Sequence, residues 1–170
     1  MSIIQRWRDR GRRARAIAHA EGLLQQGHYE SAAAELLPLV DADPADSIVA
    51  RKVIEAYAEL GRGDDVAARL ATLIEADAQQ VTLVNNASFD DMRATDAFRA
   101  VYEAAIRAIT AQLTDAPDDS AARLLLAEYY EALGDSSAAH AEYTRLGQDD
   151  DPGTRGRAAY LAARLHLSDG

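Results

Sequence analysis

Residues 25–44 read QQGHYESAAAELLPLVDADP, and residues 59–78, ELGRGDDVAARLATLIEADA, repeat the same order of small and apolar residues. Gly27 falls on Gly61, and the apolar positions that follow each glycine keep the same register. The matched apolar positions are Ala32 with Val66, Leu36 with Leu70, and Leu39 with Leu73. The period is about 34 residues, and a fixed period of this length is typical of a repeated structural unit that stacks on its neighbours.

A third copy of the pattern begins near residue 132 and reads ALGDSSAAHAEYTRL. Gly134 follows Gly61 at the same separation as that between Pro44 and Pro117. This separation exceeds two periods, so one intervening unit carries about five extra residues. The spacing therefore predicts four units, of which the third is longer than the others.

Each recurring residue type has a physical role in such a unit. Gly27, Gly61 and Gly134 are expected just after a helix end, where a left-handed residue closes the last turn and glycine adopts that conformation at least cost. Pro44 and Pro117 are expected at the start of the following helix, where the missing N–H costs nothing. Small residues let two antiparallel helices approach closely. The alanines expected at these contacts are Ala32, Ala105 and Ala139.

The composition favours helices. Hydrophobic residues make up 48% of the chain and aromatic residues only 6%, because much of the apolar share is alanine, the best helix former. Only four prolines and ten glycines interrupt the chain, so we expect an almost all-helical fold. Cysteine is absent, which excludes a disulfide framework, a thiol nucleophile and a cysteine-rich zinc site.

The charge is unevenly distributed along the chain. Residues 1–15, MSIIQRWRDRGRRAR, hold six arginines and one aspartate, which is a net charge of +5. Since the whole chain has a formal charge of -10, the remainder of the chain carries -15. A basic N-terminal arm therefore precedes an acidic body, which would repel nucleic acid.

The repeat resembles the tetratricopeptide repeat (TPR), a helix-turn-helix unit of about 34 residues. The resemblance covers most of residues 13–150, and the departures are Ala16 and Ala50 in place of an aromatic residue and Ala78 in place of a proline. The residues that carry it are Gly27, Tyr29, Ala32 and Pro44; Tyr57 and Gly61; Tyr102, Ala105 and Pro117; and Ala127, Tyr130, Gly134 and Ala139. The resemblance implies an all-α fold, a right-handed superhelical stack of antiparallel helix pairs.

The predicted organisation has six parts. A basic amphipathic N-terminal arm covers residues 1–12, the four repeats cover 13–46, 47–80, 81–119 and 120–150, and a C-terminal capping helix with a tail covers 151–170. Unit three is degenerate in its first half, where Ser88 with Asp91 three residues later is a candidate helix cap and a second helical piece restarts near Thr95. The final helix is expected to cover the open end of the stack. Pro38 is expected to bend the second helix of unit one.

The resemblance also implies a binding surface. In the family, the first helix of each unit lines the concave side of the stack. The matching positions are Ile17, Glu21, Gln25, Ile48, Arg51, Glu55, Glu59, Leu124, Glu128 and Glu131. Aligned carboxylates repel one another, so this groove is expected to favour a basic peptide or helix of a partner protein. The alternative is that these residues are solvated faces of an acidic protein.

The arm has several interpretations that the sequence leaves open. If it is helical, Ile3, Ile4 and Trp7 fall on one side and arginines surround the rest, a pattern that suits an anionic membrane surface. A helix packed on unit one would have the same pattern. Two further candidate partners of the arm are nucleic acid and the acidic groove of the same or a neighbouring molecule. Gly11 is expected to weaken a continuous helix.

The function that we predict is a non-catalytic scaffold or adaptor for protein–protein interaction, with no cofactor, no metal and no enzymatic activity. The histidines share no metal-ligand spacing, and the chain has no nucleophile elbow, phosphate-binding loop or dinucleotide fingerprint. A peripheral membrane scaffold docked by the arm, a regulatory subunit of an enzyme and self-association are the alternatives. The sequence has no apolar run of membrane-spanning length, and we expect a cytoplasmic protein. One lysine against seventeen arginines favours a bacterial source.

Overall fold

The computed structural model describes the backbone of residues 3–168 and the side chains of residues 11–167. In this part of the chain the regular elements are all helices, which confirms the predicted all-helical class. The chain divides into two compact units, Met1–Phe98 and Arg99–Gly170, and each is described by itself.

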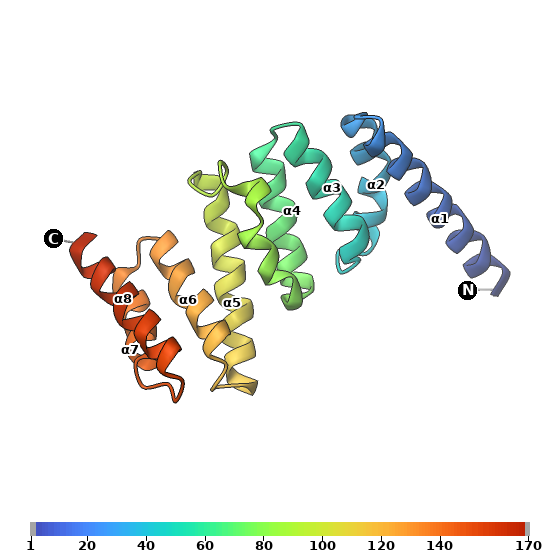
Figure 1. The fold of residues 1–170 in the computed structure, drawn as a ribbon. Coiled ribbons are helices and arrows are strands. Elements are labelled where there is room, and N and C mark those ends of the chain that lie inside the picture. Colours follow the sequence, from blue (N-terminus) through green and yellow to red (C-terminus); the bar gives the residue numbers. More distant parts are fainter. Residues whose placement is uncertain (1–2, 169–170) are drawn as a thin grey trace. The chain divides into compact units, whose positions relative to one another are not determined.

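The Met1–Phe98 unit contains four α-helices followed by three short 3₁₀ helices. They are α1 (Ile3–Gln25), α2 (Tyr29–Ala42), α3 (Ser47–Glu59), α4 (Gly63–Ala76), η1 (Ala78–Asn85), η2 (Ala87–Phe89) and η3 (Asp96–Phe98). α1 packs against α2, α2 against α3 and α3 against α4, and α4 also packs against η1 and η3 (Figure 1). The core is built from helix faces that small and aliphatic side chains line.

The Arg99–Gly170 unit contains four α-helices. They are α5 (Arg99–Asp115), α6 (Ser120–Ala132), α7 (Ser136–Leu146) and α8 (Pro152–Ser168). Neighbours along the chain again pack side by side, and α8 contacts both α7 and α6. The predicted final helix is therefore present, and it begins at Pro152.

Three glycines close helix pairs in the same way. Gly27, Gly61 and Gly134 have φ values of 75°, 66° and 76°, and no other described residue has a positive φ. The residue after each glycine donates its backbone N–H to the carbonyl five residues earlier, at 2.9 Å in all three turns. This is the hydrogen bond of the Schellman motif, so the role predicted for these glycines is confirmed.

The role predicted for the prolines is wrong in position. Pro44 and Pro117 do not start a helix but lie in the turn before it, because an aspartate takes the capping position. The Asp46 and Asp119 side chains accept hydrogen bonds from backbone N–H groups in the first turns of α3 and α6, at 3.3 and 2.9 Å. A proline with its fixed φ suits the second position of the preceding turn.

The degenerate third unit differs from its prediction. Residues 78–98 form three 3₁₀ helices, and Asn86 rather than Ser88 is the cap, since its side chain accepts a hydrogen bond from the Ser88 N–H at 2.9 Å. The buried rings of Phe89 and Phe98, 6.3 Å apart, hold the segment to the core. The Arg93 guanidinium donates to the carbonyls of Val84 and Asn86. Aromatic packing and the arginine therefore hold this segment in place, in addition to the backbone hydrogen bonds of its short turns.

The described part of the arm and the first helix of unit one form a single helix, α1. The backbone of α1 continues through Gly11 and through the predicted boundary between residues 12 and 13, and α2 continues through Pro38. The side chains of Ile3, Ile4 and Trp7 lie outside the described residues, so the membrane and packing interpretations of the arm stay predictions. Arg13, just beyond the arm, forms an ion pair with Asp46 before α3.

The predicted contact alanines are buried. Ala32, Ala105 and Ala139 have no exposed surface, as close packing of paired helices requires. The apolar positions of the repeating pattern, among them Leu36, Val66 and Leu70, are also fully buried. The small and apolar residues that recur along the sequence are therefore the residues that form the core.

Replacing Gly134 with alanine is expected to destabilise the Arg99–Gly170 unit by about 1–2 kcal/mol, because an L-residue resists the left-handed conformation. A β-carbon at this position would meet no atom within 4 Å, so backbone strain is the only cost. Gly156→Ala is the matched control, since Gly156 lies inside α8 with equal space around it. In urea unfolding, the free energy of unfolding of this control should be unchanged or up to about 1 kcal/mol higher. Equal effects of both substitutions would contradict the role of Gly134.

Candidate functional site

The ten predicted groove residues lie on three helices, α1, α3 and α6. Seven belong to the Met1–Phe98 unit and three to the Arg99–Gly170 unit. The α1 group is Ile17, Glu21 and Gln25; the α3 group is Ile48, Arg51, Glu55 and Glu59; and the α6 group is Leu124, Glu128 and Glu131. The three groups differ in what already contacts them.

The α6 group contacts the final helix of the chain. Arg157 of α8 lies 3.3 Å from a carboxylate oxygen of Glu128, and Arg164 lies 2.6 Å from one of Glu131. The Tyr143 hydroxyl donates to the second oxygen of Glu131 at 2.6 Å. Burial, reinforced by this hydrogen bond, raises the pKa of Tyr143, so the phenol remains a neutral donor at neutral pH. Both carboxylates therefore stabilise the packing of α8.

Apolar contacts place the α8 arginines beside these carboxylates. Ala158, Leu161 and Leu165 of α8 are buried in a cluster with residues of α6 and α7, and Leu124 packs against that cluster. Burial of these side chains fixes the rotation of α8 about its axis. Arg157 and Arg164 then lie at the edge of the contact, on the side of Glu128 and Glu131.

The α1 group has one ion pair with α3. The single lysine, Lys52, lies 2.8 Å from Glu21 and so joins the exposed sides of α1 and α3. Gln25 is exposed and Ile17 is half-buried. This group therefore borders the α3 group, and Lys52 pairs with its single charged side chain, Glu21.

The α3 group is open to solvent. Ile48, Arg51, Glu55 and Glu59 are all exposed and follow one another at helical spacing along one side of α3, which we call the α3 face. Ile48 is 66% exposed, an unusual position for a large aliphatic side chain. Among the side chains that the structure describes, none forms an ion pair with Glu55 or Glu59. These carboxylates face water.

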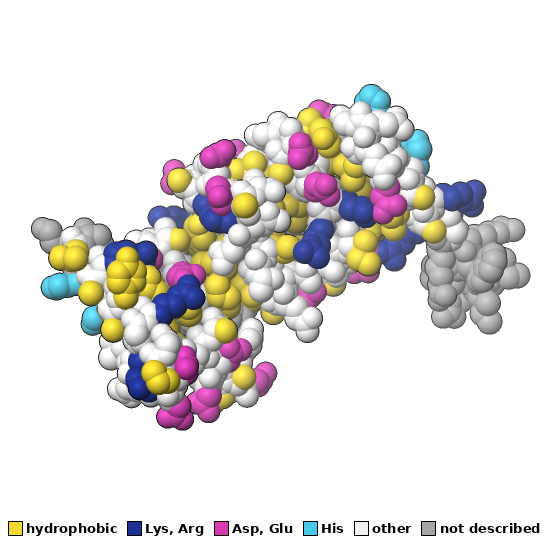
Figure 2. Space-filling model, in the orientation of Figure 1, with side chains coloured by type: hydrophobic (Ala, Val, Ile, Leu, Met, Phe, Trp, Pro, Cys, Tyr) yellow, Lys and Arg dark blue, Asp and Glu magenta, His cyan; other side chains and the backbone are white. Residues whose placement is uncertain are grey.

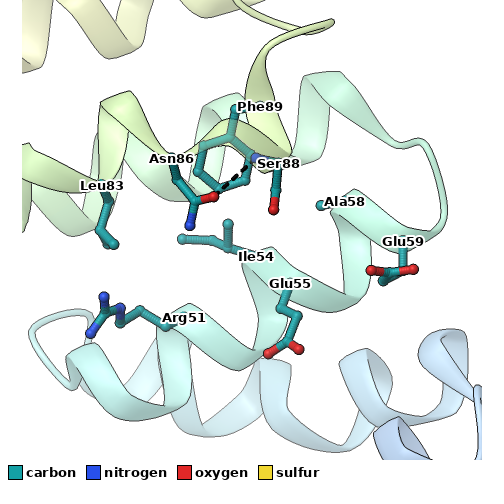
Figure 3. Close-up of a pocket in the computed structure, with 9 residues that line it drawn as sticks. All are labelled: Arg51, Ile54, Glu55, Ala58, Glu59, Leu83, Asn86, Ser88 and Phe89. Atoms are coloured by element: carbon teal, nitrogen blue, oxygen red, sulfur yellow. Dashed lines mark hydrogen bonds between the residues drawn. The ribbon is translucent and has the colours of Figure 1, made fainter.

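A pocket of about 280 Å³ opens between the α3 face and the 3₁₀ segment. Its residues are Arg51, Ile54, Glu55, Ala58, Glu59, Leu83, Asn86, Ser88 and Phe89. Figure 3 shows Ile54 and Phe89 in the interior of the pocket and the charged residues of α3 along its rim. A wider, shallower hollow adjoins the pocket at Ala58 and Ser88, and Asp64 and Asp91 line it.

Sequence reasoning missed the half of this pocket that residues 83–89 supply. Leu83, Asn86, Ser88 and Phe89 come from the segment where the repeat loses its pattern, and no family position corresponds to them. The signal that could have revealed these residues is the loss of the repeat pattern, because a unit that lacks its regular first helix leaves a gap beside the preceding unit.

The site suits a side chain better than a cofactor. Its volume lies just below the roughly 300–1,000 Å³ typical of small-molecule sites. Its apolar interior can accept an aliphatic or aromatic side chain of a ligand, and the two carboxylates on its rim can pair with a cationic side chain of the same ligand.

In the described part of the chain, no group of three or more histidine, aspartate or glutamate side chains has metal-binding geometry. No described helix combines the length and apolarity that would let it cross a bilayer.

Comparison of the chain with protein-family models and with curated proteins found no match. The likeness to the tetratricopeptide repeat therefore depends on the residues and turns of this chain.

The α6 and α3 carboxylates are expected to differ in their effect on stability. Glu128→Gln combined with Glu131→Gln removes charge from two contacts with α8 and should lower the free energy of unfolding by about 1–2 kcal/mol. Glu55→Gln with Glu59→Gln makes the same change of charge on open surface and should stay within about 0.5 kcal/mol of the parent. Urea unfolding followed by circular dichroism gives both values, and a larger loss in the second variant would mean that Glu55 and Glu59 have structural partners.

Proposed function

We propose that this chain is a non-catalytic protein-binding module of the tetratricopeptide-repeat class and that it binds a basic helix or peptide of another protein on the α3 face. The observation that carries the proposal is a pair of exposed carboxylates, Glu55 and Glu59, that no described side chain neutralises and that line a pocket together with Ile54 and Phe89. The ligand anchors an apolar side chain in the pocket, and its arginine or lysine side chains pair with the rim.

The repeat architecture belongs to the same proposal. Three helix pairs close with a left-handed glycine and the same backbone hydrogen bond, as stacked identical units require. In the proposed arrangement the pairs form a right-handed superhelix, and α1, α3 and α6 line its concave side. The α3 face is then the part of that side with both open carboxylates and a pocket.

Electrostatics explains why the ligand should be basic. Two neighbouring carboxylates on a surface repel each other, and a cationic side chain of the ligand relieves that repulsion. The opposite charges also raise the rate at which the ligand associates. The neighbouring Asp64 and Asp91 add negative charge beside the pocket. Arg51 lies nearer the start of α3 than these carboxylates, so charge is not uniform along the α3 face and this asymmetry can orient the bound chain.

The affinity of such a site is modest. An open surface must order its ligand and desolvate charges before a net gain results, so binding in the micromolar range is expected. Most of the discrimination comes from the anchor side chain in the pocket, since exposed ion pairs contribute little each.

An amphipathic helical peptide with one leucine face flanked by arginines is the probe for this proposal. It should bind the full chain with micromolar affinity, and a peptide with glutamate in place of each arginine should not bind. Glu55→Gln with Glu59→Gln should weaken binding about tenfold, as fluorescence anisotropy of the labelled peptide would measure. Glu103→Gln with Asp115→Asn is the control, because it removes the same charge from exposed positions on α5. Equal affinity in both variants would exclude the α3 face as the site.

A further inference from the structure

The last helix, α8, differs in charge from the rest of the chain. Its sequence, PGTRGRAAYLAARLHLS, contains three arginines and no acidic residue, although the whole chain has a formal charge of -10. Arg157 and Arg164 keep 63% and 52% of their side-chain surface exposed beside Glu128 and Glu131. A guanidinium has five donors, so each arginine can reach a second acceptor from this position.

The outer side of α8 is apolar. Tyr160 and Leu167 are 69% and 82% exposed, and they are seven residues apart, on the side of the helix away from the buried Leu161 and Leu165. Gly156 and Ala163 lie on the same side as Tyr160 and Leu167 and are also exposed. Figure 2 shows hydrophobic and arginine side chains next to one another over α8.

Exposed large hydrophobic side chains are few in the described residues and fall on two helices. They are Tyr160 and Leu167 on α8 and Ile48 on the α3 face. One of these surfaces carries arginines beside its apolar residues, and the other carries two carboxylates, one arginine (Arg51) and an open pocket, which leaves it with a net negative charge. The two surfaces are complementary in charge. Each also exposes a large apolar side chain that the described part of the chain does not bury.

We propose that the outer side of α8 of one molecule binds the α3 face of a second molecule. Tyr160 or Leu167 enters the pocket over Ile54 and Phe89, and Arg157 and Arg164 approach Glu55 and Glu59. The proposal depends on the proposed function, because it names the helix that the α3 face recognises. The contact between α8 and α6 is its precedent within the chain: there the same two arginines already meet glutamates of a neighbouring helix.

The proposed contact joins two different surfaces, so it is heterologous. Such a contact produces either a reciprocal pair or a chain of molecules that grows with concentration. Because its charges are exposed, rising salt concentration should weaken it. Growth beyond two molecules would separate it from an interface in which the same surface meets itself, because such an interface closes as a dimer.

Sedimentation velocity of the full chain at concentrations up to about 1 mM is the test. The wild-type protein should self-associate at low salt. One variant, Glu55→Arg with Glu59→Arg, disables the α3 face, and another, Tyr160→Ala with Leu167→Ala, disables the outer side of α8. Each variant alone should remain monomeric. Glu103→Arg with Asp115→Arg makes the same charge change elsewhere and should associate like the wild type.

Mixing the two disabled variants decides whether the surfaces are partners. Each variant retains one intact surface, so an equimolar mixture should form a one-to-one complex that neither forms alone. A wild-type protein that stays monomeric, variants that associate normally, or a folded mixture without a complex would each overturn the proposal. If the leucine-arginine peptide still binds in that case, the proposed function stands and only the identity of the helix is wrong.

Discussion

The structure depends on the requirement that each helix of a repeat cover the apolar side of the helix before it. Single units of this kind cannot bury their own apolar surface, so each needs a neighbour. In the Arg99–Gly170 unit, α8 meets this requirement for α6 and α7. In the Met1–Phe98 unit, residues 78–98 cover α4 with 3₁₀ turns, and two phenylalanine rings replace the apolar side of a full helix.

This difference decides which carboxylates are available. Glu55 and Glu128 occupy the same place in the repeat, since each precedes its left-handed glycine, Gly61 or Gly134, by the same interval. The side chain of Glu128 meets an arginine of α8, whereas Glu55 lines a pocket that stays open between α3 and residues 83–89 of the 3₁₀ segment. Loss of regularity in one repeat therefore produces an open site, while regular packing uses up the equivalent position elsewhere.

The sequence predicted those features that a fixed period and a single residue type determine. The left-handed glycines, the buried alanines and the helix pairs belong to this group, since each follows from a local steric rule. It did not predict that Arg157 and Arg164 would contact Glu128 and Glu131, because which residues pair across helices depends on how α8 is rotated. It also missed Phe89 as a pocket residue, since an irregular segment has no period from which to assign its faces.

The α3 face is open to solvent, whereas α8 covers the side of α6 that carries Glu128 and Glu131. Because the chain has no cysteine, a single introduced thiol reports its own exposure. The rate of labelling should be compared for Glu55→Cys and Glu131→Cys in folded protein, each relative to the same variant in urea. The thiol at 55 is expected to react nearly as fast in the folded as in the unfolded state, and folding is expected to slow the thiol at 131 strongly. Protection at 55 equal to that at 131 would contradict this difference in exposure.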